Sequence, residues 1–488
     1  YFMSNFLAID QGTTSSRAIV FNSKLNAVVD SQKEYKLSYP KDGWVEADPA
    51  DILNTVKETV NNVLADNNSI TACGITNQRE STVVWSRETG EPIYPVIIWQ
   101  DRRTHQFCKE LIDSGNEKMV RDKTGLVIDP YFSATKIKWI LDNVTEARDL
   151  AKDGKLMFGT IDSFLIYSLT KEKGHFTDVT NASRTMLFNI NSMEWDSDLL
   201  DLFDIPLSMM PDVKPCDGNF GTLDLDNKHI NIKGVIGDQQ AALVGQNCFS
   251  YGDIKSTYGT GCFLMVNTKE KIITLDEGLL TTVGYQLNNE INYAIEGSIY
   301  SCGNIIQWLR DKLKFFANAK DSESFLNKNG NSKNVHFLPA FNGLGAPYWN
   351  SDIRGGFYGI TQDCDNADLT TAAFKSICYQ TRDITELLNK NNIKINSLFI
   401  DGGMTANKTF CQLLSNILQT NISKPANIES TALGACVVSQ IAEGLSIKDI
   451  KIELEDIYDP NISSAEFYTN DYLSWKDFIH RTISNIKQ

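Results

Sequence analysis

The sequence predicts an α/β protein with large lobes, because apolar strands alternate with amphipathic helices along the chain. One plan of strand, glycine-and-hydroxyl turn and strand occurs at residues 6–21 and again at residues 254–266, although the two stretches share too little identity to establish a repeat. At roughly 150 residues per domain, a chain of 488 residues corresponds to about three units, and two large lobes fit as well.

The composition indicates an acidic, globular protein. With 46 basic and 61 acidic residues the net charge is -15, which argues against a nucleic acid or a membrane surface as partner. The 10 cysteines are scattered singly, a pattern typical of a reducing compartment, and no apolar run reaches the ~18 residues of a membrane-spanning helix. We therefore expect a cytoplasmic protein without membrane insertion, in which any anionic ligand is held by locally placed donors.

The first glycine-and-hydroxyl turn offers the groups that bind a phosphate. It follows a buried strand at residues 6–9 and contains Asp10, Gly12, consecutive hydroxyl residues at 13–16, and Arg17. Backbone N–H groups, hydroxyls and the guanidinium could together surround a phosphate, and Asp10 could hold Mg²⁺ through water. The alternative is a polar turn closed by an Asx-type hydrogen bond.

A charged pair follows the next strand. Residues 49–64 have apolar positions at the helical period behind Asp48, a capping residue, and they predict a helix that covers the sheet. The strand at residues 70–76 then leads to Arg79 and Glu80. Adjacent strand residues face opposite ways, so this pair can serve one polyhydroxyl substrate only where the backbone bends. The alternative is an exposed ion pair that contributes little stability.

Aromatic residues stand at the ends of two further segments. Trp99 follows an apolar strand, and Tyr131 precedes a helix that runs through Ile140. Such residues usually lie in a core, but here they could also form an apolar wall with a phenolic group. Residues 181–187, which begin with Asn181, Ala182, Ser183 and Arg184, look like a polar loop, and their chemistry assigns them no role.

Asp238 stands near the middle of the chain, between a small apolar strand and a helix of small residues at 241–243. Open α/β sheets gather their ligands at such strand ends. An acid at this place could be a general base, and it could equally cap the following helix.

The second half of the chain contains two more glycine turns. Residues 258–261 form the second glycine-and-hydroxyl turn, and residues 401–403 carry paired glycines before a helix expected over about 405–418. Two facing turns would grip the phosphates of a nucleotide from both sides, and paired glycines let such a ligand approach the backbone. Tight packing is the alternative for the paired glycines. The tail from residue 468 predicts a helix anchored by Trp475.

These motifs resemble those of the FGGY carbohydrate kinases, and among them the members that phosphorylate glycerol. The resemblance covers nearly the whole chain and rests on residues 10–17, 77–80, 131–143, 237–240, 257–263 and 401–403. It implies an α/β fold of two ribonuclease H-like (actin-like ATPase) domains with a cleft between them. The expected domains are residues 1–246, which bind glycerol and phosphate, and residues 247–488, which bind the nucleotide.

The resemblance also implies roles for individual residues. ATP and Mg²⁺ are the expected cofactors, Asp238 is the expected general base, Asp10 is expected beside the metal ion, and a homodimer or higher homo-oligomer is expected. The expected glycerol-binding residues are Arg79, Glu80, Trp99, Tyr131, Asp238, Gln239 and Phe263. The expected nucleotide-binding residues are Thr13, Thr14, Ser15, Arg17, Thr260, Gly303, Gln307, Gly403 and Asn407.

Two places depart from the family pattern. Lys375 replaces an acidic or amide residue at the end of the family's second signature, and we expect only a surface consequence. Residues 221–229 lack the glycine- and arginine-bearing loop that binds a sugar bisphosphate inhibitor in bacterial relatives, so inhibition of that kind is not expected. His229, within this stretch, is interpreted as an exposed loop histidine.

Two other functions stay open at this point. Another FGGY kinase could act on a sugar or a longer polyol such as xylulose or gluconate, whereas Arg79 and Glu80 with Trp99 favour the small triol. An actin-like ATPase that acts on a protein partner would explain the glycine turns, but it leaves Arg79, Glu80 and Tyr131 without a function.

Overall fold

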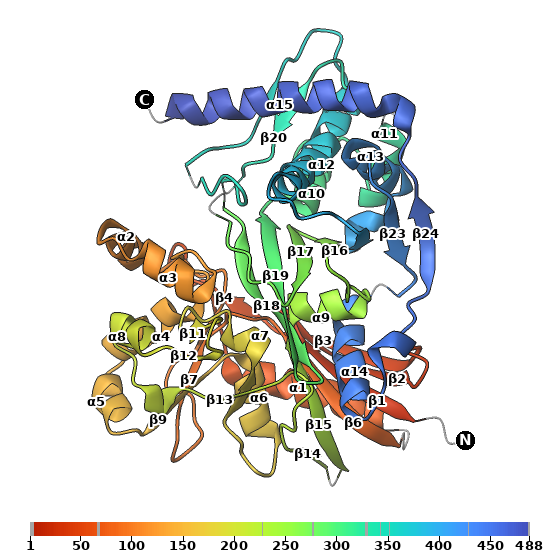
Figure 1. Cartoon of the computed structure of the whole chain (residues 1–488). Coiled ribbons are helices and arrows are strands. Elements are labelled where there is room, and N and C mark those ends of the chain that lie inside the picture. The colour runs from red at the N-terminus through yellow and green to blue at the C-terminus, as the bar shows by residue number, and fades with distance from the viewer. Residues whose placement is uncertain are drawn as a thin grey trace.

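Two large sheets organise the chain (Figure 1), and the computed structural model describes residues 4–65, 69–226, 228–275, 278–326, 330–341, 343–350, 352–427 and 429–486. The first sheet has the spatial order β14 (Thr222–Leu225), β15 (Lys228–Gly237), β6 (Ile70–Asn77), β1 (Asn5–Gln11), β2 (Ser15–Asn22) and β3 (Ala27–Glu34). The second has the order β18 (Leu280–Leu287), β19 (Glu290–Ile299), β17 (Cys262–Lys269), β16 (Asp253–Tyr258), β22 (Ser397–Asp401), β23 (Ile422–Pro425) and β24 (Leu454–Tyr458). The predicted α/β architecture of two large lobes is confirmed.

Short strands and helices complete the described fold. The short strands are β4 (Leu37–Ser38), β5 (Glu46–Ala47), β7 (Val83–Ser86), β8 (Val96–Ile97), β9 (Leu156–Gly159), β10 (Phe176–Asp178), β11 (Phe188–Asn189), β12 (Glu194–Trp195), β13 (Asp212–Lys214), β20 (His336–Leu338) and β21 (Gly356–Tyr358). The helices are α1 (Pro49–Leu64), α2 (His105–Asp113), α3 (Glu117–Thr124), α4 (Ser133–Asn143), α5 (Ala147–Lys152), α6 (Ile161–Leu169), α7 (Val179–Ala182), α8 (Ser197–Phe203), α9 (Asp238–Gly245), α10 (Gly303–Asp311), α11 (Ser322–Phe325), α12 (Asn366–Lys390), α13 (Lys408–Leu418), α14 (Ser430–Ala442) and α15 (Ala465–Ile486).

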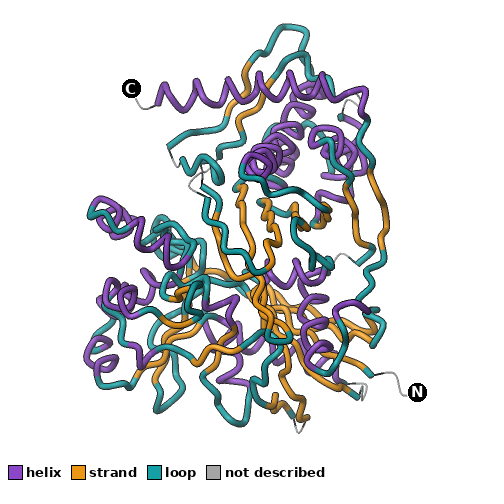
Figure 2. Tube along the Cα trace, viewed as in Figure 1, coloured by secondary structure: helices purple, strands orange, loops and turns teal. Residues whose placement is uncertain are grey.

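Helices cover both faces of the first sheet (Figure 2). In β1, Leu7 and Ile9 pack in one cluster with Val56 of α1, whereas Ala8 between them packs in another cluster with Ala435 of α14. Because neighbouring side chains of a strand point to opposite faces, a strand covered on both sides is apolar throughout. This explains the unbroken apolar run in the sequence.

The strand register brings the polar residues that follow the strands of the first sheet to the same end of that sheet. β1 runs parallel to β6, with Asp10 opposite Thr76, and β6 runs parallel to β15, with Asn77 opposite Gly237. The carboxyl ends of these three strands therefore meet, which brings together the residues that follow them. In the second sheet, the parallel pair β16 and β22 places Thr257 opposite Asp401 in the same way.

Helix α14 comes from the second half of the chain, yet it packs on α9 and on strands β6, β15 and β1 of the first sheet. Backbones touch there, since a side-chain carbon at Gly434 would lie 1.8 Å from the carbonyl oxygen of Ala241, and one at Gly74 would lie 2.1 Å from that of Ala435. Small residues are therefore required at this contact. The predicted domain boundary at residue 246 stays a prediction, and α14 links the two parts across it.

Lys375 lies inside α12, and the expectation of a surface position is wrong. Its side chain is 2% exposed, its Nζ lies 2.5 Å from Asp471 Oδ2, and it donates to Ser332 Oγ at 2.8 Å. Helix α15 packs over this position and supplies the carboxylate that a buried ammonium requires. The predicted tail helix is confirmed as α15, where the indole of Trp475 donates to the Phe337 carbonyl at 2.9 Å.

The hairpin of β14 and β15 contains the stretch without the inhibitor-loop pattern. His229 is exposed as expected, but it lies in strand β15 rather than in a loop, and its Nδ1 is 3.2 Å from Asp224 Oδ1. Among the described residues, no helix combines the length and apolar character needed to cross a membrane.

Candidate active site

The charged part of the site begins at a bend after β6. β6 ends at Asn77, and the backbone bends at Arg79 and Glu80, which leaves Arg79 Nε 3.5 Å from Glu80 Oε1. Both side chains are buried, with 1% and 2% of their surface exposed. The expected bend is confirmed, and the alternative of an exposed ion pair is wrong.

Two more charged residues complete a buried ion-pair network. Glu296, from β19 of the second sheet, accepts hydrogen bonds from Arg79 Nη1 at 2.6 Å and from Arg184 Nη2 at 3.0 Å. Arg184 Nε in turn donates to Glu80 Oε1 at 2.7 Å. Two guanidinium groups and two carboxylates thus alternate, so that each buried charge has an opposite charge beside it.

The two arginines determine the charge of Glu296. Burial alone raises a carboxyl pKa, but Arg184 and Arg79 outweigh this effect and lower the pKa of Glu296 to about 2. Glu296 is therefore an anion at physiological pH. It connects two arginines of the first half of the chain to the second sheet.

The sequence motifs do not point to Arg184 or Glu296. Helix α7, capped by the Asp178 carboxylate, takes up the first two residues of the loop expected at residues 181–187, and the turn after α7 carries Arg184 to the network. The polar stretch around Arg184 does not indicate from the sequence alone that this arginine belongs to the site. For Glu296 a signal exists, because a glutamate within an otherwise apolar strand requires a buried cationic partner.

Three aromatic rings from both halves of the chain lie next to this network. Trp99 lies edge-on to Tyr131, with ring centroids 5.5 Å apart, and to Phe263, with centroids 6.3 Å apart. Trp99 Nε1 also donates to Thr13 Oγ1 at 2.9 Å, and Tyr131 Oη accepts from Arg79 Nη2 at 3.3 Å. The structure thus brings the predicted polyol-binding residues together beside the first glycine-and-hydroxyl turn.

Lys136 holds the segment that carries Tyr131. Its Nζ donates to the carbonyl oxygens of Pro130, Tyr131 and Phe132 at 2.5, 2.6 and 3.1 Å. Burial lowers the pKa of Lys136 to about 8, although Glu80 opposes this shift. An ammonium surrounded by three carbonyls restrains the loop and so the position of the phenol.

Asp238 is the first residue of α9, and Gly237 rather than Asp238 occupies the cap position. Its Oδ1 accepts from the Gln239 N–H at 2.7 Å and lies 3.3 Å from Arg79 Nε, while 31% of its side chain is exposed. Burial raises the pKa of Asp238, Arg79 opposes the increase and Glu80 adds to it. A partly accessible carboxylate of increased basicity is suited to accept a proton from a bound hydroxyl.

Asp10 lies where negative charge accumulates. Burial raises its pKa to about 7, Asp238 and Glu429 add to the increase, and Arg17 opposes it. Among the described residues, no group of three or more histidine, cysteine or acidic side chains could hold a metal ion by itself. Mg²⁺ commonly uses one or two carboxylates together with substrate phosphates, so Asp10 fits a cation that binds with a nucleotide.

The first glycine-and-hydroxyl turn is compact, because the Gly12 N–H donates to the Ser15 carbonyl at 2.9 Å. Thr14 is exposed, while Thr13 and Ser15 are half-buried. Ser16, by contrast, is buried, with its Oγ 2.9 Å from a hydroxyl of α1. Three of the four consecutive hydroxyl residues are therefore accessible to a ligand.

Arg17 is held by two carboxylates. Its Nη2 lies 2.9 Å from Asp30 Oδ2, and its Nη1 lies 2.5 Å from Glu429 Oε1. Glu429 directly precedes α14, so this ion pair joins the first hairpin to the second half of the chain. A phosphate at this turn would compete with both carboxylates for Arg17.

Backbone segments converge at the glycine turns of the second half. The Gly303 N–H donates to the Gly259 carbonyl at 2.9 Å, and a side-chain carbon at Gly303 would lie 2.5 Å from that oxygen. Gly402 has a φ of +93°, and a side-chain carbon there would lie 2.5 Å from the Tyr258 carbonyl oxygen. Gly403 is exposed and faces open space, so packing explains Gly402 but not Gly403.

Polar groups border this space. Thr260 and Gln307 are exposed, and Gln307 lies one helical turn after Gly303 on α10. Asn407 caps α13 by accepting from the Phe410 N–H at 2.8 Å, whereas its Nδ2 is buried and has no hydrogen-bond partner among the described residues. Thr260, Gln307 and Gly403 are therefore accessible to a ligand, whereas the unpaired amide donor of Asn407 is buried.

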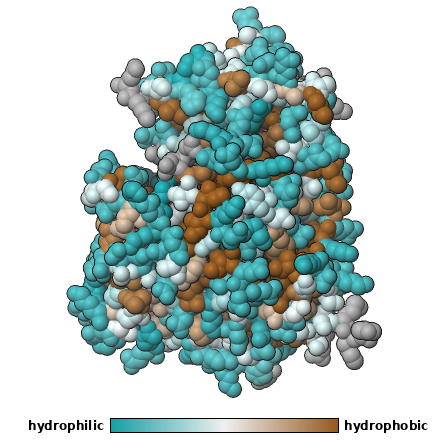
Figure 3. Space-filling view, viewed as in Figure 1, coloured by the Kyte–Doolittle hydropathy of each residue, from teal (hydrophilic) through white to brown (hydrophobic). Residues whose placement is uncertain are grey.

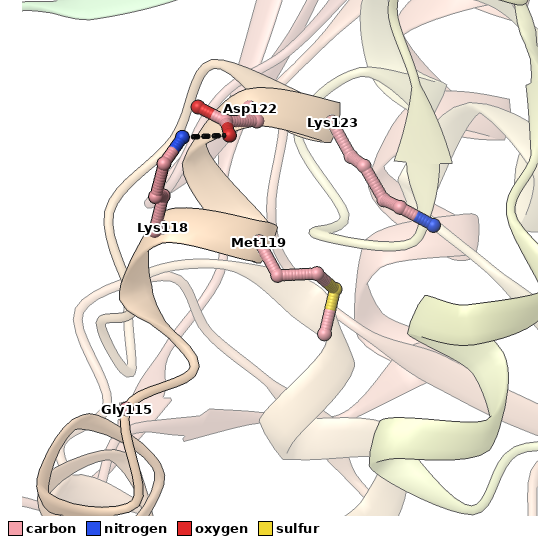
Figure 4. Close-up of a pocket in the computed structure, with 5 residues that line it drawn as sticks. All are labelled: Gly115, Lys118, Met119, Asp122 and Lys123. Carbon is pink, nitrogen blue, oxygen red and sulfur yellow. Dashed lines mark hydrogen bonds and ion pairs between the residues drawn. The ribbon is translucent and has the colours of Figure 1, made fainter.

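A shallow hollow of about 400 Å³ lies elsewhere, on α3. It is lined by Gly115, Lys118, Met119, Asp122 and Lys123, and Lys118 pairs with Asp122 within it (Figure 4). Lys123 is engaged by Asp196 at 2.7 Å. None of the predicted site residues lines this hollow. The space-filling view instead shows an indented outline between the upper and lower-left parts of the molecule (Figure 3).

Comparison with known families gives two matches that follow one another along the chain. The N-terminal domain of the FGGY family of carbohydrate kinases matches residues 5–245, and the C-terminal domain of that family matches residues 254–443. The matches together span most of the sequence.

Individual relatives resemble the chain over nearly its full length. The glycerol kinase of Marinomonas sp. (strain MWYL1) is 47% identical over 97% of this chain and 98% of that protein. Glycerol kinase 1 of Pseudomonas aeruginosa is 48% identical over 91% of both chains. Among solved structures, the Plasmodium falciparum glycerol kinase with ADP superposes with a TM-score of 0.92 and 35% identity, covering 98% of each chain.

Proposed function

The chain belongs to the FGGY family of carbohydrate kinases, and from this premise we propose that it is an ATP-dependent glycerol kinase. The enzyme transfers the γ-phosphoryl group of ATP to a primary hydroxyl of glycerol, forming sn-glycerol 3-phosphate and ADP. Full-length similarity to glycerol kinases at 47% and 48% identity supports this assignment.

One feature of the structure carries the choice of substrate. Buried Arg79 and Glu80 lie beside the partly exposed Asp238, and the rings of Trp99 and Tyr131 stand next to them. Charged donors and acceptors can pair with several hydroxyls, while rings cover a short carbon chain. This combination suits a small triol, and we propose that Gln239 and Phe263 complete the glycerol site.

The proposed mechanism uses Asp238 as general base. Its carboxylate accepts the proton of the primary hydroxyl as the hydroxyl oxygen attacks the γ-phosphorus. The bond between that phosphorus and the bridging oxygen breaks, and ADP leaves with the electron pair. The raised pKa of Asp238, due mainly to burial, makes the carboxylate a better proton acceptor. General-base catalysis of this kind typically contributes about 10² to 10⁴-fold in rate.

Phosphoryl transfer otherwise requires alignment and charge stabilisation. We propose that Thr13, Thr14, Ser15 and Arg17 contact the transferred phosphate, after Arg17 exchanges part of its contact with Glu429 for the phosphate. Asp10 would hold Mg²⁺, which supplies positive charge to the nucleotide phosphates. Thr260, Gly303, Gln307, Gly403 and Asn407 would bind the nucleotide, so residues 1–246 and 247–488 would contribute acceptor and donor sites respectively.

Other kinases of this fold act on different polyols. The gluconate kinase of Lactobacillus acidophilus superposes with a TM-score of 0.89 at 22% identity, a likeness that shows the fold alone. The acceptor therefore has to be argued from the site.

We further propose that the enzyme works in the cytoplasm as a homodimer or higher homo-oligomer. All 10 cysteines are free thiols and most are buried, a state that a reducing compartment maintains. Light scattering on the purified chain measures the oligomeric state directly.

A panel of polyols tests the proposed function. The purified chain is incubated with ATP, Mg²⁺ and glycerol, xylulose, gluconate or arabitol, and ADP release is followed. We expect turnover with glycerol far above that with the other compounds, together with sn-glycerol 3-phosphate as product. Turnover indifferent to every polyol would instead indicate an ATPase, and preference for a longer polyol would indicate another member of the family.

A further inference from the structure

A buried lysine of the second sheet reaches into the acceptor site. Lys255 lies in β16, its side chain is fully buried, and its Nζ donates to the Gln239 side-chain oxygen. The same ammonium donates to the Phe263 carbonyl at 3.1 Å and lies 3.2 Å from Thr257 Oγ1. Gln239 belongs to α9 in the first half of the chain, so this contact crosses between the two halves.

The chemistry of an ammonium determines which end of the Gln239 amide it meets. A lysine ammonium has three donors and no acceptor, so the amide must present its oxygen, and its Nε2 must point elsewhere. Burial lowers the pKa of Lys255, while Asp401, Glu296 and Asp238 oppose the shift and favour the charged form. No hydrogen bond from Gln239 Nε2 is formed within the described part of the chain, and the side chain of Gln239 is only half-buried.

We propose that Lys255 is a positioning residue that fixes the orientation of the Gln239 amide, so that Gln239 presents an N–H donor to a hydroxyl oxygen of the acceptor. The neighbouring Asp238 presents an acceptor, and the two residues together form a donor and acceptor pair at the start of α9. Such a pair recognises a hydroxyl group in both of its hydrogen-bonding roles. Without Lys255 the Gln239 amide is free to rotate, and the flipped orientation would present its oxygen instead of its N–H to the acceptor.

This inference rests on the proposed glycerol kinase function. A purely structural role for Lys255 would instead affect the stability of the protein and every kinetic constant together. A positioning role instead predicts a specific loss of glycerol affinity, because the nucleotide-binding residues do not contact Lys255.

A double-mutant cycle separates the two roles. Lys255→Met keeps the length of the side chain without its charge, Gln239→Met removes the amide, and the double variant combines both changes. Each single variant is expected to raise the KM for glycerol roughly 3- to 10-fold, the range of one lost hydrogen bond. The double variant should show no larger increase than Gln239→Met alone, and the KM for ATP should change less than about twofold.

Lys375→Met provides a control, since Lys375 is also a buried lysine of the second half of the chain but pairs with Asp471 between α12 and α15. This variant should melt at a lower temperature with an unchanged KM for glycerol. Lys255→Gln keeps a donor, so it should bind glycerol better than Lys255→Met. Glycerol affinity is also measured by calorimetry, which remains informative for a variant that turns over slowly.

The possible outcomes are distinct. The positioning role would be overturned if the increases in the KM for glycerol of the two single variants multiplied in the double variant. It would also be overturned if Lys255→Met bound glycerol with normal affinity. Equal binding by the Met and Gln variants at position 255 would also contradict it. Lack of glycerol-dependent turnover in the unmodified enzyme would instead overturn the proposed function.

Discussion

The proposed acceptor side and the proposed nucleotide side of the site are built in opposite ways. On the acceptor side, Arg79, Glu80, Arg184 and Glu296 are buried and joined to one another by ion pairs. On the nucleotide side, Thr260, Gln307 and Gly403 are exposed, and Asn407 keeps a buried donor without a partner among the described residues. The charged groups of the proposed acceptor side are therefore held by one another, whereas the groups of the proposed nucleotide side are left accessible or without a partner.

This difference has a consequence for specificity. Preorganised charges discriminate between acceptors because they cannot move to suit a different compound. The acceptor side also depends on both halves of the chain, since Glu296 and Phe263 come from the second sheet, whereas Arg79 and Trp99 belong to the first half of the chain. Changes that separate the two halves should therefore weaken glycerol binding before they weaken nucleotide binding.

The largest expected effect comes from the proposed base. Asp238→Asn keeps the shape of the side chain but removes its ability to accept a proton, so kcat should fall by about 10² to 10⁴-fold. Glycerol binding should persist, because an amide oxygen can still accept a hydrogen bond. Steady-state kinetics and calorimetry with glycerol measure the two quantities. Near-normal turnover in this variant would remove Asp238 from the role of base.

Breaking the buried network should produce the next largest effect. Glu296→Gln leaves the charges of Arg79 and Arg184 without their shared anion, and loss of one partner from a buried pair costs about 3 to 5 kcal/mol of unfolding free energy. The KM for glycerol should rise as well, because Arg79 loses its restraint. Urea unfolding and glycerol kinetics test both expectations.

Glu429→Gln is the matched control for that change. It also removes a carboxylate from an arginine, but Arg17 and Glu429 are 25% and 29% exposed, and Arg17 keeps Asp30. Surface pairs contribute about 0 to 1 kcal/mol, so stability should hardly change. Equal destabilisation by Glu296→Gln and Glu429→Gln would contradict the difference expected between a buried and a partly exposed ion pair.

The residues proposed for the nucleotide side stand in local sequence motifs, whereas the charge network of the acceptor side does not. Glycine turns and helix caps are local, so Gly403 and Asn407 can be found from short motifs. The pairing of Arg79 with Glu296 joins residues 217 positions apart, and it depends on how the two sheets meet. Arg184 is likewise invisible until α7 places it.

The same limit explains the misplaced lysine. Lys375 occupies a motif position that suggests a surface residue, and only the packing of α15 on α12 brings Asp471 to it. The sequence predicts the tail helix, yet it does not predict how this helix packs on α12. Alternation of strands and helices was sufficient for the fold class, because every buried strand must be covered by helices.

Two adjacent glycines sharpen the description of the nucleotide side. Gly402→Ala should lower the unfolding free energy by about 1 to 3 kcal/mol, because its φ of +93° and the nearby Tyr258 carbonyl leave no room for a side chain. Gly403→Ala faces open space and should change stability by less than about 0.5 kcal/mol. Its KM for ATP should nevertheless rise, by roughly 3- to 10-fold if about 1 kcal/mol of binding is lost. An unchanged KM for ATP would argue that no nucleotide approaches Gly403.

A pH dependence of stability is also expected at the junction of the two sides. Burial and the carboxylates of Asp238 and Glu429 raise the pKa of Asp10 from 3.8 to about 7. Between these values the native protein holds a proton that the unfolded chain has released, so stability contributed by Asp10 is present below pH 3.8 and is lost as pH rises toward 7. Asp10→Asn should therefore lose less unfolding free energy than the unmodified protein when pH rises from about 4 to 7, as measured by urea titration. Mg²⁺ with ATP should reduce this difference, because a cation beside Asp10 favours its charged form. Parallel pH profiles of the two proteins would show that Asp10 does not hold such a proton.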